Sequence, residues 1–204
     1  MFEFGDLRFR PIEREDLKLL HVWENDYELM MFSRSRPMNS RSMVQLEQQF
    51  EEWMKDERET RFIIELADSK EAVGIARVEI WDGCNMRNAN VGTYIGKKDL
   101  WGKGLGGQIT VALLEICFNL LNVERCGASS VEYNHRAHEV LLECGFKKSG
   151  TERQSHFVNG KKWDDLYFDI LREEYRQLRM DLLKKVLGDK LEEYFRRSDP
   201  TGKQ

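Results

Sequence analysis

Apolar residues recur at the spacing of one helix face in five segments of the chain. The predicted helices cover residues 15–29, 43–54, 109–121, 136–143 and 173–195. Ser42 and Gln45 stand in the pattern of a capping box, which places the start of the second helix. The helix after residue 108 also carries apolar residues away from its main face, so we expect it to be largely buried.

Short apolar or alternating runs bounded by turn residues predict seven strands. They cover residues 7–10, 61–66, 73–81, 90–95, 125–131, 147–157 and 163–170. A short turn joins the second and third strands, so we expect these two to pair in an antiparallel manner. Asn159 and Gly160 separate the last two strands, and this dipeptide is typical of a tight hairpin.

A glycine-rich stretch lies between a predicted strand and the long buried helix. Its glycines at 102, 104, 106 and 107 open the backbone to a ligand, and the helix start offers unpaired N–H groups and a positive dipole end. This combination predicts a phosphate-binding loop. Lys103 is not followed by Ser or Thr as in a P-loop. The dinucleotide pattern G-x-G-x-x-G is matched from residue 102, but no acidic residue ends a second strand about 20 residues later. A tight turn without any ligand is the third interpretation.

The segments around the glycine-rich stretch favour a phosphate-binding loop over a turn without a ligand. The chain resembles the GNAT family of acyl-CoA-dependent N-acyltransferases in four segments, which are Tyr94-Ile95, Trp101-Gly102-Lys103-Gly104-Leu105-Gly106, Asn134-His135-Arg136-Ala137 and Leu142-Glu143-Cys144-Gly145-Phe146. Trp101 stands where the family carries Gln or Arg. The opening at residues 7–17 and the hairpin at residues 156–161 resemble the branch of ribosomal-protein and spermidine N-acetyltransferases. The resemblance, from about residue 7 to about residue 171, implies an α+β fold in α/β/α layers, with a mixed, largely antiparallel central sheet and an acyl-CoA cleft.

The last predicted helix continues beyond this resemblance. We therefore expect an acyltransferase domain over residues 1–171, a C-terminal helical extension over residues 172–197 and a disordered polar tail over residues 198–204. The extension could serve as a partner surface or as an intramolecular cover, and a homodimer is one open arrangement.

The resemblance implies acetyl-CoA as cosubstrate and a set of residues that hold it. Backbone groups of Tyr94, Ile95 and Gly96 would pair with the pantetheine amides, and the loop N–H groups would bind the pyrophosphate. The implied cofactor-binding residues are Tyr94, Ile95, Gly96, Trp101, Gly102, Lys103, Gly104, Leu105, Gly106, Gly107, Asn134 and Arg136. No metal is implied.

The resemblance to N-acyltransferases also implies a base that deprotonates the acceptor amine and an acid that protonates the leaving thiolate. A primary ammonium has a reference pKa of about 10.4, so a base must remove a proton before attack. This branch often carries an acidic residue at the position of Asn90, which cannot act as a base. Glu79 and Asp82 are the catalytic carboxylates that we predict instead. The branch also carries a tyrosine, which acts as the acid for the leaving thiolate, where Leu141 stands. In this chain Ser130, Tyr133 or a water could donate that proton instead, or the thiolate could leave without assistance.

The composition of the chain limits the kinds of partner and metal site that we expect. The 204-residue chain has a formal net charge of −4, which gives no basic field for nucleic acid and mildly suits a cationic substrate. We see no membrane span and no secretory signal, and four cysteines without C-x-x-C spacing predict neither a zinc site nor a disulfide framework. A cytoplasmic protein with reduced thiols is expected.

The predicted reaction is transfer of an acetyl group from acetyl-CoA to a primary amine. The acceptor could be a small molecule such as a polyamine or the N-terminal amine of a protein. A non-catalytic acyl-CoA-binding sensor or scaffold is the alternative, favoured by Asn90 and Leu141.

Overall fold

The computed structural model describes the chain apart from residues 34–39, 82–84 and 199–204. In these described parts eight strands form one sheet in the order β1-β2-β3-β4-β5-β6-β8-β7. The strands are β1 (Phe2–Phe4), β2 (Leu7–Pro11), β3 (Glu59–Leu66), β4 (Ala72–Trp81), β5 (Asn88–Ile95), β6 (Arg125–Val131), β7 (Lys147–Val158) and β8 (Lys161–Leu171). The β5–β6 pair is parallel and the other pairs are antiparallel, so the predicted mixed, largely antiparallel sheet is confirmed.

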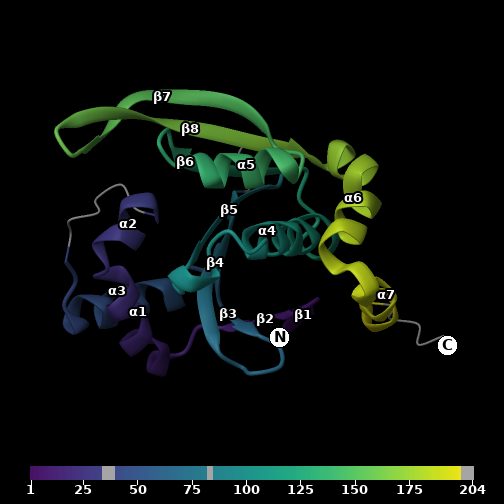
Figure 1. The fold of residues 1–204 in the computed structure, drawn as a ribbon, viewed down its shortest axis with the longest axis horizontal. Helices are drawn as coiled ribbons and strands as arrows, with labels where there is room; N and C mark the ends of the chain where they lie inside the picture. Colours follow the sequence, from purple (N-terminus) through teal and green to yellow (C-terminus); the bar gives the residue numbers. More distant parts are fainter. Residues whose placement is uncertain (34–39, 82–84, 199–204) are drawn as a thin grey trace.

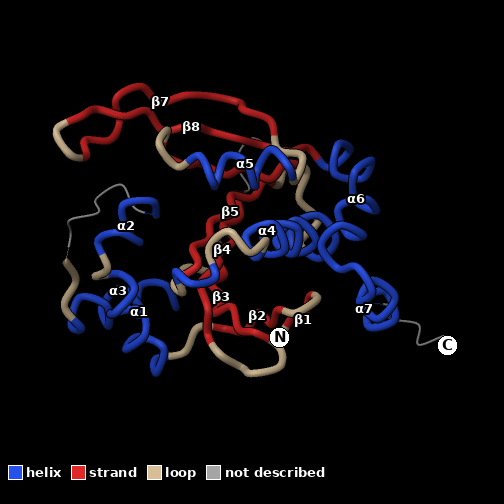
Figure 2. Tube along the Cα trace, viewed as in Figure 1, coloured by secondary structure: helices blue, strands red, loops and turns tan. Residues whose placement is uncertain are grey.

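Helices cover both faces of this sheet (Figure 1, Figure 2). They are α1 (Leu17–Glu24), α2 (Tyr27–Ser33), α3 (Met43–Lys55), α4 (Leu105–Glu115), α5 (His135–Glu143), α6 (Arg172–Leu187) and α7 (Leu191–Ser198). The larger core joins α4, α6 and α7 to one face of the sheet. A smaller core joins α1, α2 and α3 to Ile63 and Ile75 on the other face. The predicted α/β/α layering is confirmed.

Two predicted helices are each divided in the structure. The segment 15–29 becomes α1 and α2, because Asp26 accepts a hydrogen bond from the Leu29 N–H at 3.0 Å and starts a new helix. The segment 173–195 becomes α6 and α7 around Gly188, whose φ of +51° ends the first of them. The structure also adds β1, which pairs with β2 across a turn at Gly5.

The C-terminal helices are an intramolecular cover on α4. Glu115 on α4 is only 1% exposed, and its carboxylate accepts hydrogen bonds from Arg179 Nε at 2.7 Å and Nη2 at 2.8 Å. The hydroxyls of Tyr175 and Tyr194 also donate to Glu115. A buried carboxylate with this set of donors ties both α6 and α7 to α4. The expected tail lies outside the described residues, except for Ser198 at the end of α7.

Candidate functional site

The sheet opens between β5 and β6. These parallel strands pair at Asn88–Asn90 with Arg125–Gly127, and no further register is found between them in the described residues. Beyond that point β5 continues to Ile95 on β4, whereas β6 continues to Val131 on β8. Both separated stretches line one cleft of about 770 Å³. Strands that diverge in this way leave backbone N–H and C=O groups available to an extended ligand.

The glycine-rich loop forms the entrance of α4 at this opening. Gly102 and Gly104 have φ values of +73° and +81°, which glycine adopts without steric cost. A Cβ added at Gly102, Gly104 or Gly107 would meet no atom within 4 Å, so the backbone there faces open space. The first regular helix bond after the loop runs from the Gln108 N–H to the Gly104 carbonyl. The loop therefore has the bare backbone and the helix start that an anion such as a pyrophosphate requires.

Some backbone groups that we expected to face the cofactor already have protein partners. The Trp101 N–H donates to the Lys98 carbonyl at 3.1 Å, and the Trp101 indole Nε1 donates to the Ile95 carbonyl at 2.8 Å. The Gly96 N–H donates to the Val73 carbonyl at 2.9 Å. Trp101 thus fastens the loop to the end of β5, a positioning role that the sequence pattern does not indicate.

Nine of the twelve predicted cofactor-binding residues line the cleft. These are Tyr94, Ile95, Trp101, Gly102, Gly104, Gly106, Gly107, Asn134 and Arg136. The other three do not line it: Lys103 is exposed, Leu105 packs against the larger core, and Gly96 lies against the Trp23 ring. A Cβ at position 96 would lie 2.2 Å from that ring, so close packing accounts for this glycine.

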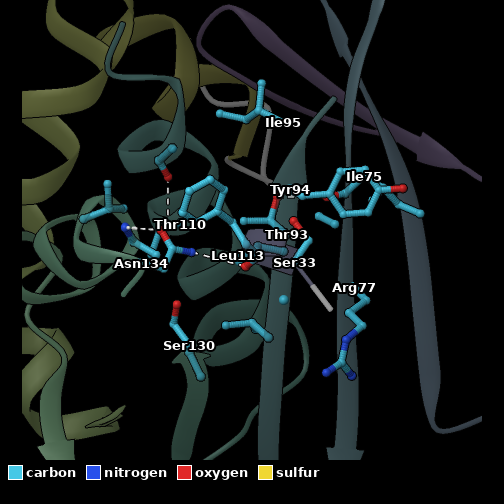
Figure 3. A pocket seen from close by; sticks show the side chains of 18 of the residues that line it. Ser33, Ile75, Arg77, Thr93, Tyr94, Ile95, Thr110, Leu113, Ser130 and Asn134 are labelled. Carbon is cyan, nitrogen blue, oxygen red and sulfur yellow. Dashed lines mark hydrogen bonds between the residues drawn. The ribbon is translucent and has the colours of Figure 1, made fainter. Parts of the chain in front are cut away.

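Asn134 and Arg136, at the start of α5, both line the cleft. Figure 3 shows Asn134 in this wall. Asn134 caps α5 by accepting from the Ala137 N–H at 3.3 Å, and its amide donates to the Phe32 carbonyl at 3.3 Å. The Arg136 guanidinium lies 4.7 Å from the centroid of the Trp101 ring, at the edge of the glycine-rich loop. Arg136 therefore offers a cation beside the loop, and Asn134 connects this wall to α2.

The opposite end of the cleft is lined by polar side chains from the N-terminal half of the chain. The lining residues there are Glu24, Arg41, Gln49, Trp53, Arg61, Arg77 and Asn90. Of these residues, only Asn90 is singled out by the sequence pattern. Arg61 and Arg77 lie on strands that the alternation of apolar and polar residues predicts. The sequence does not indicate which face of these strands lines the cleft, because that depends on how the whole sheet is assembled. Figure 3 shows Arg77 across the cleft from Asn134 and Thr110.

The predicted base residues lie away from the cleft lining or outside the described structure. Glu79 does not line the cleft, and its carboxylate accepts from Arg77 Nη1 at 3.0 Å. Its role as a base stays a prediction. Asp82 lies outside the described residues. Glu24 at the end of α1 does line the cleft; it is 6% exposed and pairs with Arg41 Nε at 3.7 Å.

Leu141 and the two hydroxyl residues considered for the leaving group, Ser130 and Tyr133, occupy different places. Leu141 and Ser130 line the cleft, so a leucine side chain faces the cavity where a tyrosine was expected in this branch. Tyr133 does not line it, and its hydroxyl donates to the Met31 carbonyl at 2.6 Å. Burial raises the pKa of Tyr133, and nearby Tyr27 raises it further, so this phenol is a weaker acid than usual. Ser130 is the better placed hydroxyl.

In the described parts of the chain, no three His, Cys, Asp or Glu side chains gather in a way that could hold a metal ion. Three buried cysteines there, Cys117, Cys126 and Cys144, are free thiols. None of the described helices is both long enough and apolar enough to cross a membrane.

Comparisons with known proteins agree with this geometry. Residues 6–147 match the family described as the acetyltransferase (GNAT) domain. A spermidine N(1)-acetyltransferase from Vibrio cholerae is 27% identical over 171 residues, which cover 84% of this chain and 96% of that protein. The crystal structure of spermidine N-acetyltransferase from Vibrio cholerae in complex with CoA and spermine has a TM-score of 0.75 at 27% identity, covering 84% of this chain and 98% of that one. A putative ribosomal N-acetyltransferase from Bacillus subtilis is 28% identical over 89 residues, 44% of this chain and 48% of that protein.

Proposed function

The chain belongs to the GNAT family of acetyl-CoA-dependent N-acetyltransferases, and we propose that it transfers the acetyl group to a primary amine by direct attack in a ternary complex. The main support for this proposal is that one cleft is lined both by the glycine-rich loop and by the polar side chains near α1 and α3. A cofactor and an acceptor can therefore meet in the same cavity without a covalent enzyme intermediate. Bringing two reactants together in this way removes much of the entropic cost of a bimolecular reaction.

The open backbone at Gly102, Gly104 and Gly107 supports a cofactor pose with the diphosphate at the start of α4. The pantetheine arm would then follow the free edge of β5 into the cavity. Acetyl-CoA supplies an activated acyl carbon and a thiolate leaving group. Arg136 would add positive charge near the phosphates.

Glu24 is the carboxylate that we assign as the base. A base must reach the proton that it removes, directly or through one water, and Glu24 lines the cleft at the acceptor end. Glu79, the carboxylate predicted from the sequence, would need to act across Arg77 or a chain of water. The neutral amine would then attack the thioester carbonyl carbon, so that an N–C bond forms and the C–S bond breaks. The proton that the nitrogen loses on becoming an amide would go to the departing thiolate, which leaves as the CoA thiol.

Ser130 is the side chain that we assign to the departing sulfur. It lines the cleft, whereas the hydroxyl of Tyr133 is engaged with the α2 backbone. A thiol has a reference pKa of about 8.5, so the thiolate leaves with only modest assistance. A hydrogen bond from a serine hydroxyl is enough under these conditions, and the missing tyrosine does not exclude catalysis.

The acceptor class includes a small-molecule amine and the N-terminal amine of a peptide. A non-catalytic acyl-CoA-binding sensor or scaffold is the competing function, supported by Leu141 and Asn90 in the cleft wall.

The discriminating experiment measures acetyl-CoA binding by calorimetry and thiol release in the presence of a panel of amines. An enzyme gives amine-dependent thiol release and an acetylated product of matching mass. Binding without thiol release for every amine would support the sensor instead. No retention of acetyl-CoA would exclude both functions.

A further inference from the structure

Among the described residues, the lining of the acceptor end contains three arginines and one glutamate. Arg61 on β3 and Arg77 on β4 stand directly opposite each other in the register of these strands, and both line the cleft. Like charges placed opposite each other in a sheet are unfavourable unless something compensates them. Arg41, just before α3, adds a third guanidinium to the same lining.

Two carboxylates on the same strands compensate the charges of Arg61 and Arg77. Glu59 and Glu79 form another pair in the same β3–β4 register, two residues along each strand, so they share the face of the arginines. Arg77 Nη1 lies 3.0 Å from Glu79 and 3.6 Å from Glu59, and Arg61 pairs with Glu59. Neither glutamate lines the cleft. The two arginines therefore line the cleft, while the glutamates that pair with them lie on the same sheet face outside the lining.

Arg61 is held in position and incompletely satisfied. Its guanidinium lies 4.1 Å from the centroid of the Trp53 ring, which fixes the plane of the group. Its Nε is buried and has no hydrogen-bond partner among the described residues. Burial lowers the pKa of Arg61, Glu59 raises it and Arg77 lowers it again, with a net lowering. An anion bound to the guanidinium groups that line the cleft would reduce the repulsion between the two arginines.

The carboxylate in this part of the lining does not cancel the charge. Glu24 is paired with Arg41 at 3.7 Å, and Arg41 Nη1 is further held by Gln49 at 3.2 Å. Arg61 and Arg77 pair instead with Glu59 and Glu79, which do not line the cleft. A polycation placed here would carry its second ammonium towards these guanidinium groups, which is unfavourable in a partly desolvated cleft.

We propose that the acceptor is a primary amine whose skeleton also carries an anionic oxygen group, a carboxylate or a phosphate, bound by Arg61 and Arg77. Guanidinium groups bind such oxyanions through paired, charge-assisted hydrogen bonds. The anion directs the amine towards Glu24, and the nearby positive charges lower the pKa of the bound amine towards its reactive neutral form. This inference rests on the proposed acetyl transfer and narrows its substrate class.

Matched amines of equal chain length test the inference in the unaltered protein. The set is 5-aminopentanoate, pentylamine and pentane-1,5-diamine, with 3-aminopropyl phosphate and peptides carrying an acidic or a basic second residue to separate the sources of the anion. We expect kcat/KM for the anionic amines to exceed that for pentylamine by roughly tenfold to hundredfold, with the diamine lowest.

Two variants locate the effect. Arg61→Gln and Arg77→Gln should each remove most of the preference for 5-aminopentanoate over pentylamine. Arg58→Gln is the control, because Arg58 is exposed, precedes the same strand and does not line the cleft. Its preference should equal that of the unaltered protein. Unchanged preference in both cleft variants would overturn the assignment.

A binding measurement separates this inference from the proposed function. Calorimetry of 5-aminopentanoate and pentane-1,5-diamine against the CoA-saturated protein requires no turnover. Tighter binding of the anionic amine, lost in Arg77→Gln, supports the anion subsite even if thiol release is absent and acetyl transfer fails. Equal or tighter binding of the diamine overturns the subsite even if acetyl transfer is observed.

Discussion

The two ends of the cleft are built from different parts of the polypeptide. The cofactor end consists largely of backbone, at the glycine-rich loop, the start of α4 and the free edge of β5. The acceptor end consists of charged and aromatic side chains from α1, α3, β3 and β4. A backbone site needs small residues at fixed spacing, which leaves a pattern in one short stretch. A side-chain site assembled from distant elements leaves no such pattern.

The largest effect should come from the acceptor end. Glu24→Gln removes the proposed base while keeping the shape of the side chain, so we expect kcat to fall about 10²–10⁴-fold. Activity should recover towards high pH, where solvent removes the amine proton. Steady-state kinetics across pH, with calorimetry of acetyl-CoA as the check on the cofactor end, measures this.

Glu79→Gln is the matched variant for that comparison, because it removes a carboxylate that faces Arg77 from outside the cleft lining. We expect a much smaller loss of kcat. If Glu79→Gln takes the large loss and Glu24→Gln does not, the base is the residue predicted from the sequence.

The next largest effect is on the stability of the fold, through the buried carboxylate of Glu115 on α4. Burial raises the pKa of Glu115, but hydrogen bonds from Arg179, Tyr175 and Tyr194 outweigh it and hold the pKa below its usual value. A depressed carboxyl pKa stabilises the fold above the unfolded pKa, and this contribution is lost as the pH falls through the folded value. Glu115→Gln should therefore cost about 3 kcal/mol at neutral pH and less in acid.

Urea unfolding at pH 7 and pH 4 measures that difference. The preference among acceptor amines should not change in Glu115→Gln, since Glu115 is buried on α4 and does not line the cleft. A pH-independent loss would mean that packing, rather than the charge, carries the stabilisation.

A smaller effect isolates the backbone of the cofactor end. Gly107→Ala adds a methyl group where nothing lies within 4 Å, in the first turn of α4. Alanine should stabilise the helix by about 0.5–1 kcal/mol. It should also weaken acetyl-CoA binding roughly tenfold to hundredfold, because one close backbone contact with the diphosphate is lost. Thermal unfolding and calorimetry should thus move in opposite senses, and a parallel change would count against the loop as the binding site.

The smallest effect is expected at Lys103. This side chain is exposed and does not line the cleft, although it lies within the loop. An exposed charge near a phosphate contributes little in salt, so Lys103→Ala should weaken acetyl-CoA binding by at most about fivefold. Calorimetry at two ionic strengths tests this. A loss larger than that of Gly107→Ala would show that side-chain charge, not backbone, dominates the cofactor end.

The sequence predicted most of the fold and little of the acceptor end. Periodicity located the strands and helices because each face is strongly apolar, and the glycine-rich stretch located the loop. Arg41 and Trp53 could not be assigned, because their roles depend on how α1, α2 and α3 pack on the sheet. Glu24 sits at the end of a helix whose break at Asp26 was not predicted, so its direction into the cleft was hidden.

The most direct test is a crystal structure of the protein with CoA. The diphosphate is expected against the N–H groups of Leu105, Gly106 and Gly107 at the start of α4, with the pantetheine arm along β5. A diphosphate bound elsewhere, with those N–H groups facing only solvent, would contradict the backbone site from which the whole cleft is interpreted.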